Sequence, residues 1–134
     1  MSLIFLLLLL LLGGFGLSMG STTDSISSQV ERAVPGWAQK QGQAGNVRYL
    51  RGARLFADSG CTNCHTYLGS GSTNLGAPDL SAEGTKGHSI SYFVSELRCP
   101  SCVKPGSPMP QFAALGPKNL RAVALFLTLS KRGP

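Results

Sequence analysis

The sequence predicts a small all-α fold in which three to four short helices are joined by long loops. Residues 46–58, 89–98 and 118–131 carry apolar side chains at roughly helical spacing. Glycine and proline supply 17 and 8 of the 134 residues, roughly 19% against a usual ~12%. A chain this short fits one domain, excludes a multidomain enzyme and buries only a limited core of its own. We therefore expect the loops to wrap around something that helps to fill that core.

An uncharged leader opens the chain, because the first charged residue is Asp24. Residues 3–12 are an unbroken apolar run with the length of the hydrophobic region of a secretory signal. The wider apolar stretch, residues 3–19, reaches the lower length limit for a membrane-spanning helix. Residues 1–20 are therefore predicted to be either a signal peptide or an N-terminal membrane anchor. Both alternatives place the rest of the chain outside the cytoplasm, in the periplasm or on the outer face of the membrane.

Residues 21–45 are rich in Ser, Gln and Gly and are interrupted by Pro35 and Gly36. This composition predicts a linker or an irregular lead-in, from which Trp37 could still dock on the folded part. The domain itself is expected to span residues 46–134.

The first helix, residues 46–58, has its start and end marked in the sequence. Asn46 is a suitable N-cap, and Ser59-Gly60 closes the helix. Its expected apolar stripe consists of Val47, Leu50, Leu55 and Phe56. Residues 66–88 are a loop rich in Gly, Ser and Thr, and residues 99–117 contain five prolines, which predicts irregular structure.

The motif Cys61-Thr-Asn-Cys64-His65 directly follows the first helix. Cys-x-x-Cys-His is the attachment signature of a c-type haem, because two thiols three positions apart can reach the two vinyl groups on one edge of a porphyrin. The next residue then lies beneath the iron and supplies an imidazole nitrogen. We therefore expect one haem c, held covalently through Cys61 and Cys64, with His65 as an iron ligand. The haem would also supply the missing core.

A second pair, Cys99-Pro-Ser-Cys102, leaves two other interpretations of the cysteines open. Four cysteines could bind zinc, but the 34 residues between Cys64 and Cys99 exceed the usual ~15–20. A thioredoxin-like redox site would need a strand and a helix around it, whereas the surroundings of Cys61 are Gly-rich loop. Val103 stands where a second haem motif would need a histidine, so we expect Cys99 and Cys102 to form a disulfide in an oxidising compartment.

The chain resembles the class I c-type cytochromes from about residue 48 to residue 130. The motifs that carry the resemblance occur in the family's order: Gly52-Ala-Arg-Leu55-Phe56, Gly60-Cys61-Thr-Asn-Cys64-His65, Gly76-Ala-Pro78-Asp-Leu80, Tyr92-Phe93 to Leu97 followed by Pro100, Ser107-Pro-Met109-Pro110-Gln-Phe112, and Val123-Ala-Leu-Phe126-Leu. The resemblance implies a small cytochrome c fold, with short helices and long loops around one haem.

The resemblance also implies roles for matching positions. The Pro78 carbonyl would accept a hydrogen bond from the far nitrogen of His65, and Leu80 would pack on the haem. Gly52 would let the first helix approach the last one near Phe126. The cofactor-binding set is then Cys61, Cys64, His65, Pro78, Leu80 and Met109, with His65 and Met109 as the metal ligands.

Met109 is the expected sixth ligand of the iron, because it stands between Pro108 and Pro110 in a stiffened loop. The other two methionines lie in the leader, which leaves His88 as the alternative sixth ligand. A histidine and a methionine together leave no open position on the iron, which favours one-electron transfer over bond-making catalysis.

We therefore predict an electron carrier rather than an enzyme, working in a respiratory or photosynthetic electron-transport chain. The alternatives are a haem c subunit of a membrane oxidoreductase complex and, from another class, a non-haem thiol or zinc protein. The formal net charge of +6 predicts redox partners with acidic docking surfaces. Membrane electron-transport complexes are the expected partners, and nucleic acid is not.

Overall fold

The computed structural model describes residues 26–133, so the predicted leader lies outside the described residues. Within them the chain forms five α-helices: α2 (Ile26–Lys40), α3 (Val47–Asp58), α4 (Ile90–Arg98), α5 (Pro100–Val103) and α6 (Gly116–Leu129). Short 3-10 helices lie between them: η1 (Cys61–Asn63), η2 (Glu83–Lys86) and η3 (Ala113–Leu115). Strands β1 (Thr66–Tyr67) and β2 (Ser70–Gly71) form a small antiparallel hairpin, and the predicted all-α fold with long loops is confirmed. Among residues 26–133, none of the helices combines the length and apolar character that a membrane crossing requires.

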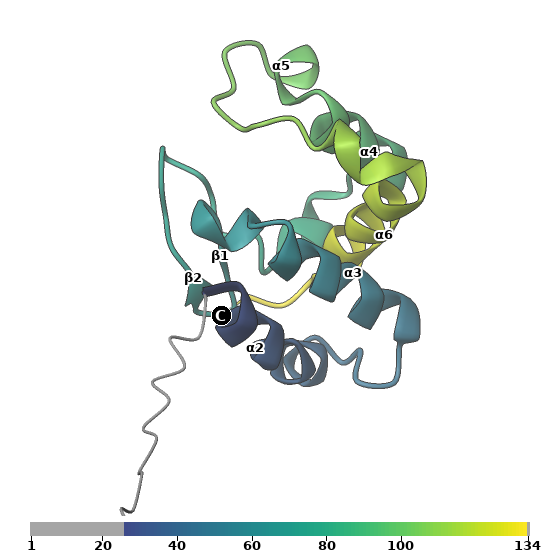
Figure 1. The fold of residues 1–134 in the computed structure, drawn as a ribbon. Helices are drawn as coiled ribbons and strands as arrows, with labels where there is room; N and C mark the ends of the chain where they lie inside the picture. The colour runs from purple at the N-terminus through teal and green to yellow at the C-terminus, as the bar shows by residue number, and fades with distance from the viewer. Residues whose placement is uncertain (1–25, 134) are drawn as a thin grey trace, which may run out of the picture.

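Helices α3 and α6 pack against each other at the centre of the fold (Figure 1). Gly52 lies where they meet: a Cβ atom there would stand 2.6 Å from the Cβ of Phe126 and would overlap the carbonyl oxygen of Ala122. The two backbones come this close because glycine has no side chain. The expectation that Gly52 lets the first helix approach the last one near Phe126 is confirmed.

An aromatic cluster fills the space beside this crossing. The Phe126 ring centroid lies 5.0 Å from that of Tyr49, 5.1 Å from that of Phe56 and 4.8 Å from that of Tyr67. The hydroxyl of Tyr67 lies 2.9 Å from the hydroxyl of Tyr49 and 2.6 Å from that of Ser130. Burial raises the pKa of both tyrosines, so their phenols stay neutral and hydrogen-bonded.

Helix α3 begins and ends where the sequence predicts. Asn46 Oδ1 accepts hydrogen bonds from two backbone N–H groups of the first turn at 3.1 and 3.2 Å, and Gly60 adopts a left-handed φ of 75° just beyond the end. The predicted apolar stripe is wrong at Val47, whose side chain is 75% exposed. Tyr49 and Ala53 are buried instead, because they flank the face that meets α6 around Gly52.

The prediction of an irregular lead-in is wrong for residues 26–40, which form α2 and pack against α3. Pro35, which suggested a break, lies inside the helix. The burial of an apolar stripe offsets the hydrogen bond that proline removes, and that stripe consists of Val30, Val34, Trp37 and Ala38. Trp37 docks as the sequence allowed: its ring lies 4.9 Å from Tyr67, and its Nε1 donates a hydrogen bond to Ser70 Oγ at 3.2 Å.

Gln41 joins the end of α2 to the C-terminal residues. Its buried side-chain nitrogen donates hydrogen bonds to the carbonyl oxygens of Ser81 and Arg132 at 2.8 and 2.9 Å. Its Oε1 accepts hydrogen bonds from the backbone N–H groups of Lys131 and Arg132, both at 2.9 Å. Since both donors and both acceptor sites of the amide are used, α2 is an integral part of the described fold.

The proline-rich segment 99–117, predicted to be irregular, contains helical structure at both ends. Pro100 opens α5 and Pro117 lies in the first turn of α6, where a missing N–H removes no helical hydrogen bond. The prediction therefore holds for residues 104–112. The loop predicted at residues 66–88 likewise contains the hairpin and η2.

Replacing Gly52 with Ala is expected to destabilise the protein, because the new methyl group meets backbone atoms that cannot move aside. Overpacking of this kind costs about 1–3 kcal/mol, and we expect a loss in that range in the free energy of unfolding, measured by guanidinium denaturation. Gly36→Ala in α2 is the matched control, because nothing lies within 4 Å of a Cβ atom there, and it should preserve or raise stability. Equal effects of the two changes would contradict the tight crossing.

Candidate haem site

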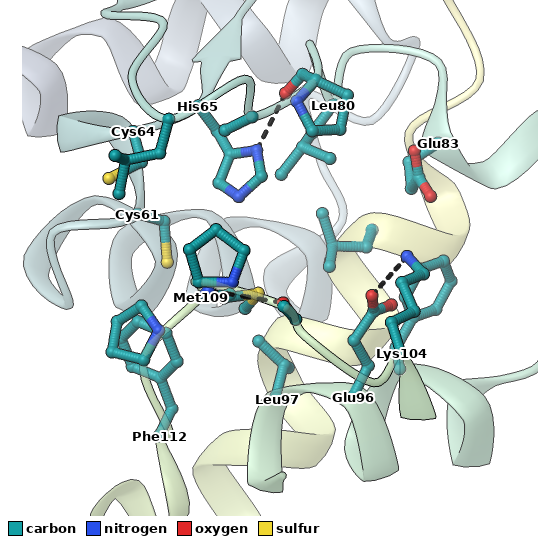
Figure 2. A pocket seen from close by; sticks show the side chains of 18 of the residues that line it. Cys61, Cys64, His65, Leu80, Glu83, Glu96, Leu97, Lys104, Met109 and Phe112 are labelled. Atoms are coloured by element: carbon teal, nitrogen blue, oxygen red, sulfur yellow. Dashed lines mark hydrogen bonds and ion pairs between the residues drawn. The ribbon is translucent and has the colours of Figure 1, made fainter. Parts of the chain in front are cut away.

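A cavity of about 270 Å³ lies between the turn after α3, the loop before η2, and α4 with the segment after α5 (Figure 2). Its walls are largely apolar and include Phe56, Leu80, Phe93, Leu97 and Leu127. Every residue predicted to bind the cofactor lines it, namely Cys61, Cys64, His65, Pro78, Leu80 and Met109. The fold thus brings together side chains from several segments that are far apart in the sequence.

Cys61 and Cys64 lie in the turn that follows α3. The backbone N–H groups of Cys64 and His65 both donate to the carbonyl oxygen of Cys61, at 3.2 and 2.9 Å. This tight turn places both thiols and the imidazole along one side of the cavity (Figure 2). Neither thiol forms a disulfide, and Cys61 is buried. Burial raises the pKa of the Cys61 thiol to about 12, which favours its protonated form.

The His65 ring is oriented by a hydrogen bond behind it. Its Nδ1 lies 2.8 Å from the carbonyl oxygen of Pro78, the contact that the family resemblance implied. Because a carbonyl oxygen only accepts, Nδ1 carries the proton and donates it. Nε2 is then left with its lone pair directed into the cavity (Figure 2). A histidine fixed in this tautomer is prepared to bind a metal ion.

Backbone contacts hold the turn and the following loop together. Ser72 N–H donates to the carbonyl oxygen of Thr62 at 3.0 Å, and Leu80 N–H donates to that of Thr66 at 3.0 Å. Gly71 passes so close to the turn that a Cβ atom there would stand 2.5 Å from the carbonyl oxygen of His65. The wall that carries the imidazole is therefore rigid.

Met109 lies across the cavity from His65 (Figure 2). Its side chain is half-buried, and its backbone N–H donates to Ser107 Oγ at 3.3 Å. Pro108 and Pro110 restrict the backbone on both sides. An imidazole and a thioether on opposite sides are the two donors that the iron of a haem can take at once.

His88, the alternative ligand, is not among the residues that line the cavity. Its ring stacks on Tyr92 with 3.9 Å between the centroids and meets Phe93 edge-on. These contacts hold it at the start of α4, so the structure favours Met109 over His88.

Two ion pairs at the cavity were not foreseen from the sequence. Lys86 Nζ lies 2.8 Å from Glu83 Oε2, and Lys104 Nζ lies 2.5 Å from Glu96 Oε1. Glu83 is only 7% exposed, and its Oε2 receives no well-aligned hydrogen bond although Lys86 is near. The three-residue spacing of Glu83 and Lys86 was a usable signal. The other pair joins residues eight apart and depends on the reversal of the chain at α5.

Cys99 and Cys102 form a disulfide, as predicted, and lie outside the cavity lining. The bond removes both thiols from a four-cysteine zinc site. Throughout residues 26–133, no group of three or more His, Cys, Asp and Glu side chains is placed to hold a metal ion.

The donor set fits a covalently held haem, because two free thiols, an imidazole with a free Nε2 and an opposing thioether share one apolar cavity. This site on a small helical fold defines a c-type haem protein. A family model for cytochrome c matches residues 49–130, and the chain belongs to that family, whose members bind haem c. Searches among curated proteins and among solved structures found no significant match.

The two cysteine pairs are expected to differ completely in haem attachment. Replacing both Cys61 and Cys64 with Ser should abolish covalently attached haem, because a hydroxyl cannot replace a thiol in thioether formation. Replacing both Cys99 and Cys102 with Ser should leave the attached haem unchanged. Intact mass after acid extraction of non-covalent haem measures both results. Loss of attached haem from the second variant while it still folds would show that Cys99 and Cys102 have another role.

Proposed function

We propose that this cytochrome c carries one haem, attached through Cys61 and Cys64, and acts as a one-electron carrier in a respiratory or photosynthetic electron-transport chain. When bound, the haem supplies an iron that alternates between the ferrous and ferric states. The observation that carries the proposal is the placement of His65 and Met109 on opposite sides of one apolar cavity.

The chain's own groups favour electron exchange over bond-making chemistry. The Pro78 carbonyl holds the His65 ring, and two flanking prolines restrict Met109, so neither side chain needs to move when the charge at the site changes. With both side chains serving as ligands, no position is left for oxygen or peroxide. The apolar walls limit access of water, and a thioether ligand raises the reduction potential relative to a second nitrogen.

A cationic face supports the expectation of acidic partners. Five exposed cations lie on the outer sides of α3 and α6: Arg48, Arg51, Arg54, Lys118 and Arg121. Arg51 donates a hydrogen bond to Asn119 Oδ1 at 3.0 Å, which joins the two rows across the helix pair. The two helices together contain one acidic residue, Asp58, at the end of α3. We infer that this cationic face docks on an acidic surface of the redox partner.

A second role is that of haem c subunit in a membrane oxidoreductase complex. The apolar residues 3–19 favour it, since a retained anchor would hold the domain at the membrane surface. Cytochrome c domains generally lie outside the cytoplasm, and both roles place this one in the periplasm or on the outer face of the membrane. Co-purification of the full chain with a membrane complex would support the subunit role, and recovery of the chain alone would support the carrier.

Met109→Ala should lower the reduction potential and leave the attached haem in place. The change removes the thioether that favours ferrous iron and opens the sixth position to water or small ligands. The potential and the weak ferric charge-transfer band near the red end of the spectrum, which accompanies sulfur ligation, measure the effect. His88→Ala is the control and should change neither. If His88→Ala abolishes six-coordination while Met109→Ala has no effect, the ligand is His88.

Loss of the cationic face should weaken binding to an acidic surface more than loss of the same charge elsewhere. We compare Arg48→Gln/Arg51→Gln/Arg54→Gln with a control that also removes three exposed cations, at Lys40, Arg98 and Lys131. Binding to immobilised polyglutamate should fall by about tenfold more in the first variant at low salt, because clustered charges act together. The difference should shrink near 0.15 M salt, where the screening length is about 8 Å. Equal losses would mean that net charge alone governs binding.

A further inference from the structure

The disulfide between Cys99 and Cys102 has no part in the proposed electron transfer. It closes the corner at which α4 ends and α5 begins, because Cys99 caps both helices. Cys99 is half-buried, and Cys102 is exposed. A disulfide that closes so short a loop restricts the unfolded chain less than one that closes a long loop. Its effect is therefore expected in the local structure of the corner rather than in global stability.

A short series of hydrogen bonds connects this corner to Met109. Lys104 N–H donates to the carbonyl oxygen of Pro100 at 2.8 Å, and Ser107 N–H donates to that of Lys104 at 3.0 Å. Ser107 Oγ in turn accepts the hydrogen bond from Met109 N–H at 3.3 Å. Each bond spans two to four residues, so a shift of the corner is passed along the chain to Met109.

Two further contacts fasten the segment 104–112 to α4. The side chain of Lys104 pairs with Glu96, and Phe112 N–H donates to the carbonyl oxygen of Leu97 at 2.8 Å. The hydrogen bond to Glu96 raises the pKa of Lys104, which keeps the ammonium charged. Since α4 packs on α6, the segment is attached to the central helices at both of its ends.

The ion pair of Lys104 with Glu96 and the disulfide differ in strength. The Lys104 side chain is 60% exposed, and exposed ion pairs contribute little. The disulfide, in contrast, is covalent and does not depend on salt. The bond between Cys99 and Cys102 is therefore the covalent constraint on the corner between α4 and α5, and it acts together with the hydrogen bond from Cys102 N–H to the carbonyl oxygen of Cys99 at 3.0 Å.

We propose that the Cys99–Cys102 disulfide is a positioning element for Met109: by locking the corner, it keeps the thioether at the cavity and limits the fraction of molecules in which the sixth position is open. The proposal rests on the proposed role of Met109 as an iron ligand. An added ligand must compete with Met109, so its apparent affinity rises in proportion to the open fraction. Affinity for such a ligand therefore measures how firmly the segment is held.

The test compares ferric, haem-loaded wild type with Cys99→Ser/Cys102→Ser in titrations with imidazole. We expect imidazole to bind about tenfold more tightly to the variant, because the open fraction grows by that factor. Attached haem should be unchanged, and the charge-transfer band should persist before imidazole is added. Lys104→Met, which keeps the disulfide, should tighten imidazole binding by only about two- to threefold, as expected for an exposed ion pair.

Asn46→Ala is the matched control, because it removes the cap of α3 and lowers stability without touching the segment. Its imidazole affinity should equal that of wild type. If the control tightens binding as much as the double variant does, or if the double variant stays within twofold of wild type, the proposal is overturned.

Chemical reduction opens the disulfide in the folded wild-type protein, so this second measurement does not require the double variant to fold. A water-soluble phosphine supplies two electrons to the disulfide and is oxidised to its oxide with oxygen from water, leaving two thiols that are then alkylated. After reoxidation of the haem with ferricyanide, this species should show the same tighter imidazole binding, and unchanged binding would contradict the proposal. Met109→Ala tests the assignment of Met109 as a ligand separately from the role of the disulfide. If Met109→Ala leaves imidazole affinity unchanged, the ligand assignment fails, whatever the disulfide does.

Discussion

The close crossing of α3 and α6 at Gly52 is the contact on which the rest of the structure depends. Because no side chain separates the backbones there, Phe126 reaches the aromatic rings of α3. The same crossing sets the direction in which α3 ends. Gly60 then reverses the chain with a left-handed φ. Cys61, the next residue, therefore lies at the cavity wall. The position of the attachment turn is thus a consequence of helix packing rather than of the loop alone.

The two sides of the cavity are fastened by different means. On the His65 side, short backbone hydrogen bonds and the close passage of Gly71 make a rigid wall, and the Pro78 carbonyl selects the tautomer of the ring. On the Met109 side, residues 104–112 form a turn followed by irregular chain, without helix or strand. Its contacts with α4 are the ion pair of Lys104 with Glu96 and the hydrogen bond from Phe112 N–H to Leu97, and the disulfide holds the corner just before it. The fixed imidazole faces a thioether, and we propose that the corner at the end of α4 controls the freedom of that thioether.

The charges at the cavity and the charges on the exterior are arranged differently. Lys86 and Lys104 pair with glutamates at the cavity, whereas the cations on the outer sides of α3 and α6 have a single acidic neighbour in those helices. Helix α2 covers the far side of the aromatic cluster, where Trp37 packs on Tyr67. The exposed cations of α3 and α6 therefore lie at the surface, while the aromatic cluster beneath them is buried.

Local features were readable from the sequence alone: the attachment motif, the Asn46 cap, helices α3, α4 and α6, and the disulfide between Cys99 and Cys102. Each depends on residues a few positions apart, so short-range geometry is enough to specify it. Burial depends instead on segments that meet only after folding. The sequence did not predict helix α2, because Pro35 indicates a break. The helix forms because the tertiary packing of Trp37 stabilises it. In the same way, Val47 fits an apolar stripe by spacing, yet the direction of the α6 contact leaves it in solvent. The attachment of the Met109 segment to α4 through Glu96 and Leu97 follows from the reversal of the chain at α5, which tertiary structure alone determines.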